Sequence, residues 1–445
     1  MSLPSCPQNA LTIALVLSKI DLVEAVHIIQ PNPLWIVPFG ALLLCIALMP
    51  FIAPHWWHRR YPWIAVGLGA LTVGYYVFGL HNGMRMLHSL HEYVSFIALI
   101  GSLFVVSGGI HINVRGESTP MANVLYLLAG ALLANVLGTT GASMLLIRPF
   151  LRTNKYRLTT YHVVFFIFIV SNVGGCLTPL GDPPLFLGYL RGVPFFWVAE
   201  QCWPMWAFAV GALLAVFWVI DYRNFLRAPR AVRAKETAHE EWRFDGMHNV
   251  FFLLLIVVAV FIQQPPFVRE ALMVVAAVGS YFTTKKPVHE ANDFNFAPLK
   301  EVAFLFVGIF ATMVPALDWL ELNARQVGIQ TAGQFYWGSG ALSAVLDNAP
   351  TYLCFLSAAI GLFGDSGVTT PAQLVAANHL YLVAISVASV FFGACTYIGN
   401  GPNFMVKSIA DHVKARTPSF FGYVFCYVVP ILLPVYAVVW WIWFK

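Results

Sequence analysis

The sequence has few charged residues. Asp, Glu, Lys and Arg together make up 10% of the 445 residues, whereas apolar residues make up 59%. This balance excludes an ordinary soluble domain and is typical of a membrane protein with many spans. The net charge of +5 gives no reason to expect a nucleic-acid partner, because most basic residues fall between apolar segments.

Several motifs of soluble enzymes are missing. Neither GxxxxGK[ST] nor GxGxxG occurs, so no nucleotide or redox cofactor is expected. The seven cysteines have no CxxC or Cys/His spacing, so we interpret them as small core residues and expect no transition metal. An intramembrane protease would need a Ser/His dyad, an Asp pair or HExxH, and only widely separated aspartates are present. We therefore expect that the protein is not an enzyme.

The N-terminal segment, residues 1–33, has no positive charge ahead of its apolar stretch at 10–29. A signal peptide requires that charge, so this segment is not predicted to be one. Because Lys19, Asp21 and Glu24 interrupt the stretch, a peripheral or interfacial helix is favoured. A further membrane span is the alternative.

Long apolar segments fill the rest of the chain. They predict an all-α polytopic membrane protein with two transmembrane halves, 34–220 and 249–445, separated by a cytoplasmic linker at 221–248. Each half is expected to contain about five spans, one re-entrant hairpin and one broken helix. The predicted spans are 34–54, 62–80, 94–111 and 203–220 in the first half, and 249–263, 269–283, 300–317 and 418–443 in the second. The predicted hairpins are 122–147 and 332–363.

An odd number of crossings in each half would place the halves in opposite orientations, as an inverted repeat. With the start of the first span outside, 19 of the 25 Lys and Arg residues fall in inside loops. That bias agrees with the positive-inside rule. The sequence thus predicts an integral membrane protein in a lipid bilayer, placed in a bacterial inner membrane.

Two apolar segments are interrupted by glycine, proline and polar residues, at 171–184 and 393–403. Such breaks free backbone groups that lipid cannot satisfy. Discontinuous helices at corresponding positions of two halves are typical of the substrate and ion site of secondary transporters. The two breaks and the two hairpin tips are therefore the predicted site.

Asp182 and Asp347 are the carboxylates predicted within these four elements, one in each half. A carboxylate at membrane depth is a functional candidate, because it can bind either Na⁺ or a proton. A helix N-cap is the alternative role for Asp182, since prolines follow it directly. The predicted ion-binding residues are Thr139, Thr140, Ser143, Ser171, Asn172, Gly174, Thr178, Gly181, Ser343, Asn348, Thr351, Thr396, Gly399, Asn400 and Asn403.

Other ionisable residues are weaker candidates. His162, at the start of the first broken segment, is expected to be an interfacial histidine, and a proton relay is the alternative. Asp318 and Glu321 fall near the outer ends of spans and are expected to be solvated.

Residues 347–351 and 397–404 resemble the second-half signature of NhaD-type sodium/proton antiporters, and residues 172–184 are similar to that group's first broken helix. These antiporters belong to the ion-transporter superfamily, with citrate carriers, arsenite exporters and dicarboxylate/sodium symporters. The resemblance implies an inverted-repeat fold, a homodimer and an elevator-like movement of the domain that carries the hairpins. It departs from the group at the first tip, 138–143, where an Asp-Asn pair is usual and this chain has Gly-Thr-Thr-Gly-Ala-Ser.

Two functions remain open. Sodium/proton antiport, with Na⁺ and H⁺ as the transported ions, would use Asp347 and Asp182 as titratable groups. Transport of citrate or another carboxylate, coupled to Na⁺ or H⁺, is the alternative, because the first tip is neutral. In that case amide and hydroxyl donors would hold the carboxylates.

Overall fold

Helices form wherever the chain is continuously apolar, since a helix satisfies its own backbone groups in lipid. The structure, a computed structural model, describes residues 28–114, 119–229 and 242–445. The predicted N-terminal helix at 10–29 lies almost wholly outside the described residues. Eight helical segments of the described residues are long and apolar enough to span a membrane. The fold is thus that of an all-α polytopic membrane protein, as predicted.

The first half begins with a 3₁₀ turn, Pro33–Ile36, and contains seven α-helices. Proline stands in the first turn of several of them, where its missing N–H costs nothing. The helices are α2 (Val37–Ile52), α3 (Pro54–Gly74), α4 (Gly83–Gly108), α5 (Pro120–Thr153), α6 (Thr160–Ile169), α7 (Pro183–Leu190) and α8 (Phe195–Arg227).

The second half contains eleven α-helices in its described residues. One π-helical segment, Tyr75–Gly79, follows α3 in the first half, and another, Val424–Leu432, lies between α19 and α20. The helices are α10 (Asn249–Val260), α11 (Val268–Thr283), α12 (Lys286–Ala291), α13 (Ala297–Thr312), α14 (Val314–Asn323), α15 (Ala332–Ser343), α16 (Asn348–Leu362), α17 (Pro371–Phe392), α18 (Gly401–His412), α19 (Phe420–Tyr423) and α20 (Leu433–Trp443).

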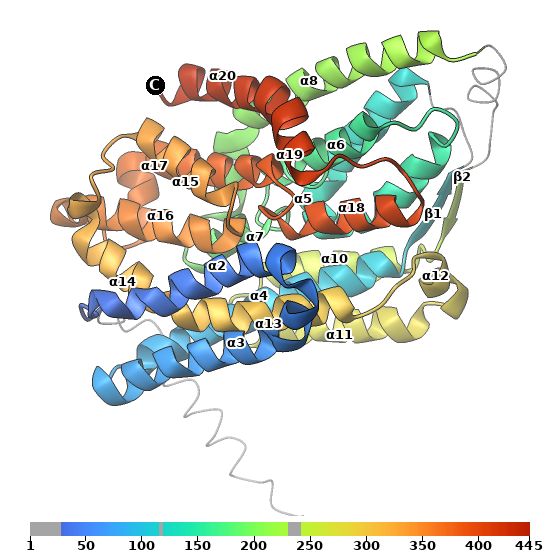
Figure 1. Ribbon diagram of the computed structural model, residues 1–445. Helices are drawn as coiled ribbons and strands as arrows, with labels where there is room; N and C mark the ends of the chain where they lie inside the picture. Colours follow the sequence, from blue (N-terminus) through green and yellow to red (C-terminus); the bar gives the residue numbers. More distant parts are fainter. Residues whose placement is uncertain (1–27, 115–118, 230–241) are drawn as a thin grey trace, which may run out of the picture.

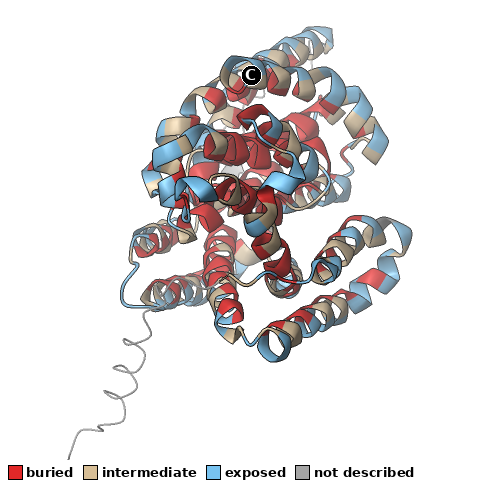
Figure 2. Cartoon of the chain, turned by 90° about the vertical axis from the view of Figure 1, so that its left-hand side faces the viewer, coloured by how far each residue is buried: buried red, intermediate tan, exposed pale blue. Residues whose placement is uncertain are grey.

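The helices are arranged in two layers (Figure 1). The lower layer consists of α2, α3, α4, α10, α11 and α13, which pack on one another. The upper layer contains α5 to α8 and α15 to α20, and α4 contacts it through α5 and α7. Buried residues concentrate where the layers meet and inside the upper layer (Figure 2).

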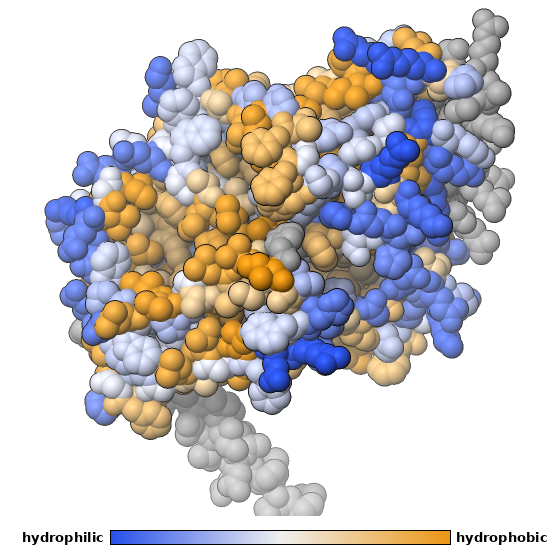
Figure 3. All heavy atoms as spheres, viewed as in Figure 1, coloured by the Kyte–Doolittle hydropathy of each residue, from blue (hydrophilic) through white to orange (hydrophobic). Residues whose placement is uncertain are grey.

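A short antiparallel ribbon joins the two halves at one end of the molecule. Strand β1 (His111–Val114) pairs with β2 (Trp242–Asp245), and Ile112 lies opposite Phe244. The helix α8 continues to Arg227, seven residues into the segment predicted as the linker. On the face seen in Figure 3, apolar side chains occupy the middle and hydrophilic side chains gather toward both ends, as expected for a molecule that crosses a bilayer.

Both predicted hairpins have arms that fold back on each other. In α5 the break is at Gly138, whose φ of 73° lies in the region that favours glycine. The arms on either side meet through Asn123 and Asn154, whose amides exchange hydrogen bonds of 2.8 and 3.0 Å. In the second hairpin α15 packs on α16, with the rings of Phe335 and Phe355 6.0 Å apart. The inverted orientation of the two halves remains a prediction.

Candidate functional site

Asp182 lies at the centre of the upper layer. The segment that contains Thr178, Pro179 and Gly181 cannot continue α6, and Pro183 then begins α7, so Asp182 occupies the N-cap position. Its side chain makes no capping bond to its own helix. Asp182 is 1% exposed, so its carboxylate is withdrawn from water and directed at other elements.

The Asp182 carboxylate accepts hydrogen bonds from three neutral side chains. Thr139 Oγ1 donates to Oδ1 at 2.7 Å, and Asn400 Nδ2 donates to the same oxygen at 3.2 Å. Asn348 Nδ2 donates to Oδ2. Asn348 Oδ1 is buried and has no hydrogen-bond partner of its own among the described residues, which leaves both lone pairs of this oxygen available.

These contacts bring four helix N-termini together. Thr139 begins the second arm of α5 directly after the break at Gly138, and Asp182 caps α7. Asn348 is the first residue of α16, and Asn400 caps α18. Each N-terminus carries a partial positive charge, roughly half an elementary charge. Their field stabilises a negative charge at the point where they meet.

A second set of hydrogen bonds links the two broken segments. Asn172 Nδ2 donates to Asn403 Oδ1 at 2.7 Å, and Asn400 Nδ2 donates to Asn172 Oδ1 at 3.1 Å and to the Ser171 carbonyl at 3.2 Å. Ser171 in turn hydrogen-bonds the hydroxyl of Ser143 at 2.7 Å. These contacts join residues more than 200 positions apart and place both breaks in one site.

Asn135 supports the first break, and the sequence analysis did not single it out. Its Nδ2 donates to the Gly174 carbonyl at 2.7 Å, and its backbone oxygen accepts a bond of 2.5 Å from the Thr178 hydroxyl. A Cβ atom on Gly181 would lie 2.1 Å from the Gly175 carbonyl oxygen, so only glycine permits this close approach. The sequence did contain a signal for this role: Asn135 is a single polar residue in an apolar run, three residues before the tip.

The second hairpin tip is closed by a similar set of contacts. Thr396 Oγ1 donates to the Ala344 carbonyl at 2.6 Å and accepts from the Gly399 N–H at 3.0 Å. Ser343 Oγ donates to the Ser389 carbonyl at 2.6 Å. These residues shape the tip but do not contact Asp182 in the described hydrogen bonds.

Asp347 differs from Asp182. It is half-buried, and its Oδ1 accepts the N–H of Ala349 in the first turn of its own helix at 3.0 Å. Its carbonyl accepts the Thr351 hydroxyl. Asp347 therefore caps its helix with its side chain, which is the role that the sequence analysis considered for Asp182.

A small cavity lies between the first tip and α4. One side is formed by Thr139, Thr140, the segment from Pro179 to Pro183, and Phe186 of α7. The opposite side is an apolar wall of α4, formed by Phe96, Leu99, Ile100, Leu103 and Phe104. None of the residues that line the cavity is basic.

Five carboxylates among the described residues are buried, and Asp182 is the one among them that is not paired with an arginine. Each of the other four pairs with an arginine, and such pairing is the usual way to bury a charge. The pairs are Glu92 with Arg191, Asp221 with Arg157, Glu270 with Arg269, and Asp318 with Arg85. Asp182 has no ion-pair partner in the described part of the chain.

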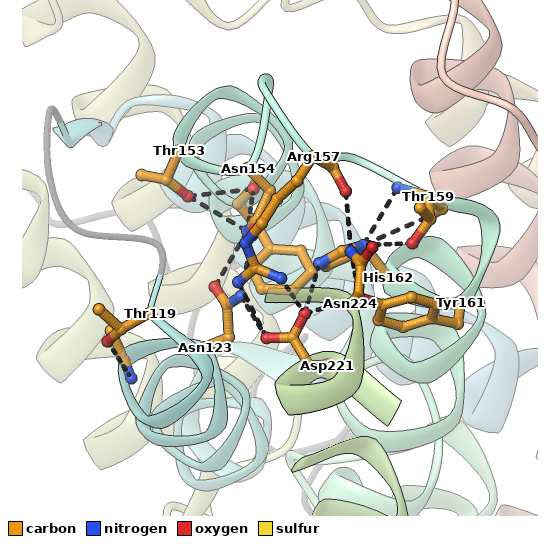
Figure 4. Close-up of polar contacts among 12 residues, drawn as sticks. Thr119, Asn123, Thr153, Asn154, Arg157, Thr159, Tyr161, His162, Asp221 and Asn224 are labelled. Atoms are coloured by element: carbon orange, nitrogen blue, oxygen red, sulfur yellow. Dashed lines mark hydrogen bonds and ion pairs between the residues drawn. The ribbon is translucent and has the colours of Figure 1, made fainter. Parts of the chain in front are cut away.

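The pair of Asp221 and Arg157 is the centre of a second buried polar cluster, at the ends of α5, α6 and α8 (Figure 4). Arg157 contacts both carboxylate oxygens, and Tyr161 donates to Oδ1 at 2.6 Å. Asn123 donates to Oδ2 at 3.0 Å, and His162 Nε2 lies 3.3 Å from Oδ1.

Two expectations are corrected here. His162 is fully buried, with Nδ1 accepting the Thr159 N–H at 3.2 Å, so it is a core residue instead of an interfacial one. Asp318 is also fully buried rather than solvated, because Arg85 and the Tyr76 hydroxyl bind its two oxygens. In both cases a partner lies far away in the sequence, Asp221 for His162 and Arg85 for Asp318.

A family model described as "Putative citrate transport" matches residues 29–444, nearly the whole chain. No curated protein matches the chain.

Proposed function

The chain belongs to the family of that model, within the ion-transporter and citrate-transporter-like group, and we propose that this membrane transporter exchanges Na⁺ or Li⁺ for protons at Asp182. The observation that carries the proposal is the buried carboxylate whose described partners are all neutral. An ionised carboxylate without a counter-charge costs several kcal/mol to bury. A proton or a small cation removes that cost, and the two exclude each other.

The residues around Asp182 suit a small hard cation. Na⁺ is bound by hydroxyl, amide and carbonyl oxygens, as hard cations in general are. Thr139 and Asn400 contact the carboxylate, and Asn348 has an unpartnered side-chain oxygen beside it. Rotation of an amide or hydroxyl would turn an oxygen toward a cation when the proton leaves.

Exchange then follows from one site with two ligands. When Asp182 faces one side of the membrane, Na⁺ displaces the proton, and when it faces the other side the proton displaces Na⁺. Broken helices and hairpins that move together as one body give such alternating access. Asp347, half-buried at the tip next to Asn348, adds a second negative charge that attracts cations without being the exchanging group.

Proton-coupled citrate transport is the second candidate. The family description favours it, and so does the convergence of four helix N-termini, which is suited to an anion. In this scheme a proton on Asp182 would free Thr139, Asn348 and Asn400 to donate to a substrate carboxylate. The apolar α4 wall and the lack of a basic lining residue argue against it, because citrate carries three carboxylates.

Purified protein in acid-loaded liposomes with a trapped pH dye separates the two candidates. Na⁺, Li⁺, K⁺ or citrate is added outside in turn while internal pH is followed. Internal alkalinisation on Na⁺ or Li⁺ alone, and its absence in Asp182→Asn, is the expected result. Uptake of labelled citrate driven by a proton gradient, with no response to cations alone, would support the second candidate instead.

A further inference from the structure

One ion pair connects the helix of Asp182 to the lower layer. Arg191 caps the C-terminus of α7, and its Nε and Nη2 donate to the two oxygens of Glu92 on α4 at 2.8 and 2.9 Å. Glu92 is 3% exposed. Asp182 and Arg191 therefore stand at opposite ends of a single eight-residue helix.

The two helices run beside each other from the ion pair to the site. Asp182 and Arg191 are nine residues apart, roughly 13 Å along α7, and Glu92 and Leu103 are eleven residues apart, roughly 16 Å along α4. Between these ends lie Phe96 and Leu99 of α4 and Phe186 of α7, all buried and all lining the cavity. The ion pair thus lies beyond the apolar layer, on the far side from Asp182.

This pair differs from another buried pair that contacts α4. Glu270 and Arg269 both belong to α11, and they meet α4 through Ser95, whose hydroxyl donates to Glu270 at 2.5 Å. That contact lies within the lower layer and ties neighbouring helices of one body. The contact between Arg191 and Glu92 instead crosses from the upper layer to the lower one.

We propose that the ion pair of Glu92 and Arg191 is a gate at one end of the Asp182 cavity, which opens when the site is exposed to the adjacent aqueous phase. The proposal rests on the proposed transport function, because a gate implies alternating access. While the pair is formed, α7 is held against α4 and the apolar side chains between them exclude water. When it separates, Arg191, at the C-terminal end of α7, can be solvated by water that enters between α7 and α4.

A second contact of the last turn of α7 offers a comparison. The Tyr189 hydroxyl donates to the Val260 carbonyl of α10 at 2.9 Å, so it too crosses between the layers. It carries no charge and does not line the cavity. Tyr189→Phe removes two neutral hydrogen bonds, the one to Val260 and one of 3.3 Å that the hydroxyl accepts from Gln263 Nε2, and leaves the ion pair in place.

The gate is tested by the accessibility of the cavity to a water-soluble thiol probe. Leu99→Cys is introduced into a full-length protein whose native cysteines are replaced, and a membrane-impermeant maleimide is applied to either side of sealed vesicles. Glu92→Gln is expected to speed labelling about tenfold from the side where α7 ends, as a shift toward the open state would. Glu270→Gln and Tyr189→Phe are expected to change labelling less than about twofold.

The charge-swapped variant Glu92→Arg with Arg191→Glu keeps the test valid if Glu92→Gln folds poorly. It is expected to be labelled at the rate of the Leu99→Cys protein with the native pair, because the pair can re-form. Unchanged labelling in Glu92→Gln, or an equal increase in Glu270→Gln, would overturn the proposal. Labelling needs no transported ion, so a gate that opens in a protein without Na⁺/H⁺ exchange would reject the proposed exchange and retain the gate.

Discussion

Asp182 and Asp221 are both buried aspartates of the upper layer, but a positive charge lies beside Asp221 and only neutral donors contact Asp182. Asp221 meets the Arg157 guanidinium, with Tyr161 and Asn123 completing its hydrogen bonds (Figure 4). Asp182 meets only amide and hydroxyl donors. The protein itself neutralises the Asp221 carboxylate, with an arginine. In the proposed function, the Asp182 carboxylate is neutralised by a proton or a cation that binds reversibly.

In the proposed function, this difference separates a structural group, Asp221, from a transporting one, Asp182. A fixed arginine partner makes the charge of Asp221 permanent and ties the ends of α5, α6 and α8 together. A carboxylate with neutral donors remains able to exchange a proton for a cation, because no built-in charge competes for it. Under the proposed function, the same residue type serves stability at Asp221 and transport at Asp182.

Asp182→Asn should have the largest effect on function. Exchange is expected to fall to the level of empty liposomes, since an amide has no proton to exchange. The thermal midpoint in detergent should stay the same or rise, because an unpaired buried charge is removed. Glu200→Gln, a change at an exposed carboxylate on α8, should leave both measurements unaltered. Exchange that survives Asp182→Asn would remove the distinction between the two aspartates.

Arg157→Ala should have the largest effect on stability. It strands a buried carboxylate, and breaking a buried pair in this way costs about 3–5 kcal/mol of unfolding free energy. Exchange per folded molecule should be retained. Arg223→Ala removes an exposed arginine of α8 and should cost within about 0.5 kcal/mol. If Arg157→Ala instead abolished exchange in folded protein, the cluster around Asp221 would belong to the transport machinery.

Asn400→Ala should weaken cation binding at Asp182 without abolishing it. A hydrogen bond to a charged group contributes about 1.5–3 kcal/mol, so the half-maximal Na⁺ concentration should rise at least about tenfold. The reason is that the proton competes more strongly once a donor to the carboxylate is lost. Gln326→Ala, on an exposed side chain, serves as the control. A concentration dependence identical to that of the wild type would show that Asn400 does not support the site.

Asp347→Asn should have the smallest effect. Asparagine caps a helix about as well as aspartate, so the unfolding free energy should change little. Loss of a nearby negative charge should raise the half-maximal Na⁺ concentration by about threefold, a difference below 1.4 kcal/mol. Asp365→Asn, at an exposed carboxylate paired with Arg325, is the matched control. Complete loss of exchange in Asp347→Asn would make Asp347, rather than Asp182, the exchanging group.

The sequence predicted the features that depend on local chemistry. Glycine and proline at 171–184 and 393–403 indicated where helices break, and the break at Gly138 falls at the predicted first tip. Hydropathy predicted the membrane class. Hydropathy could not predict which polar group each candidate residue contacts. The sequence therefore ranked Asp347 with Asp182, although it is the side chain of Asn348 that contacts the Asp182 carboxylate.

Pairs between distant segments were also beyond the sequence. Arg157 and Asp221 are 64 residues apart, and Arg191 and Glu92 are 99 apart. From the sequence alone, a charged residue near the end of a span is predicted to be solvated. Its buried partner cannot be identified, because tertiary packing decides which residues meet. His162 and Asp318 were misjudged for this reason.

The most direct test of the account is proton release on Na⁺ binding, measured with a pH dye on purified protein in weakly buffered detergent. Wild type and Asp347→Asn are expected to release protons when Na⁺ is added and not when K⁺ is added, whereas Asp182→Asn should release none. Equal proton release from Asp182→Asn and wild type would contradict the claim that Asp182 exchanges a proton for the cation.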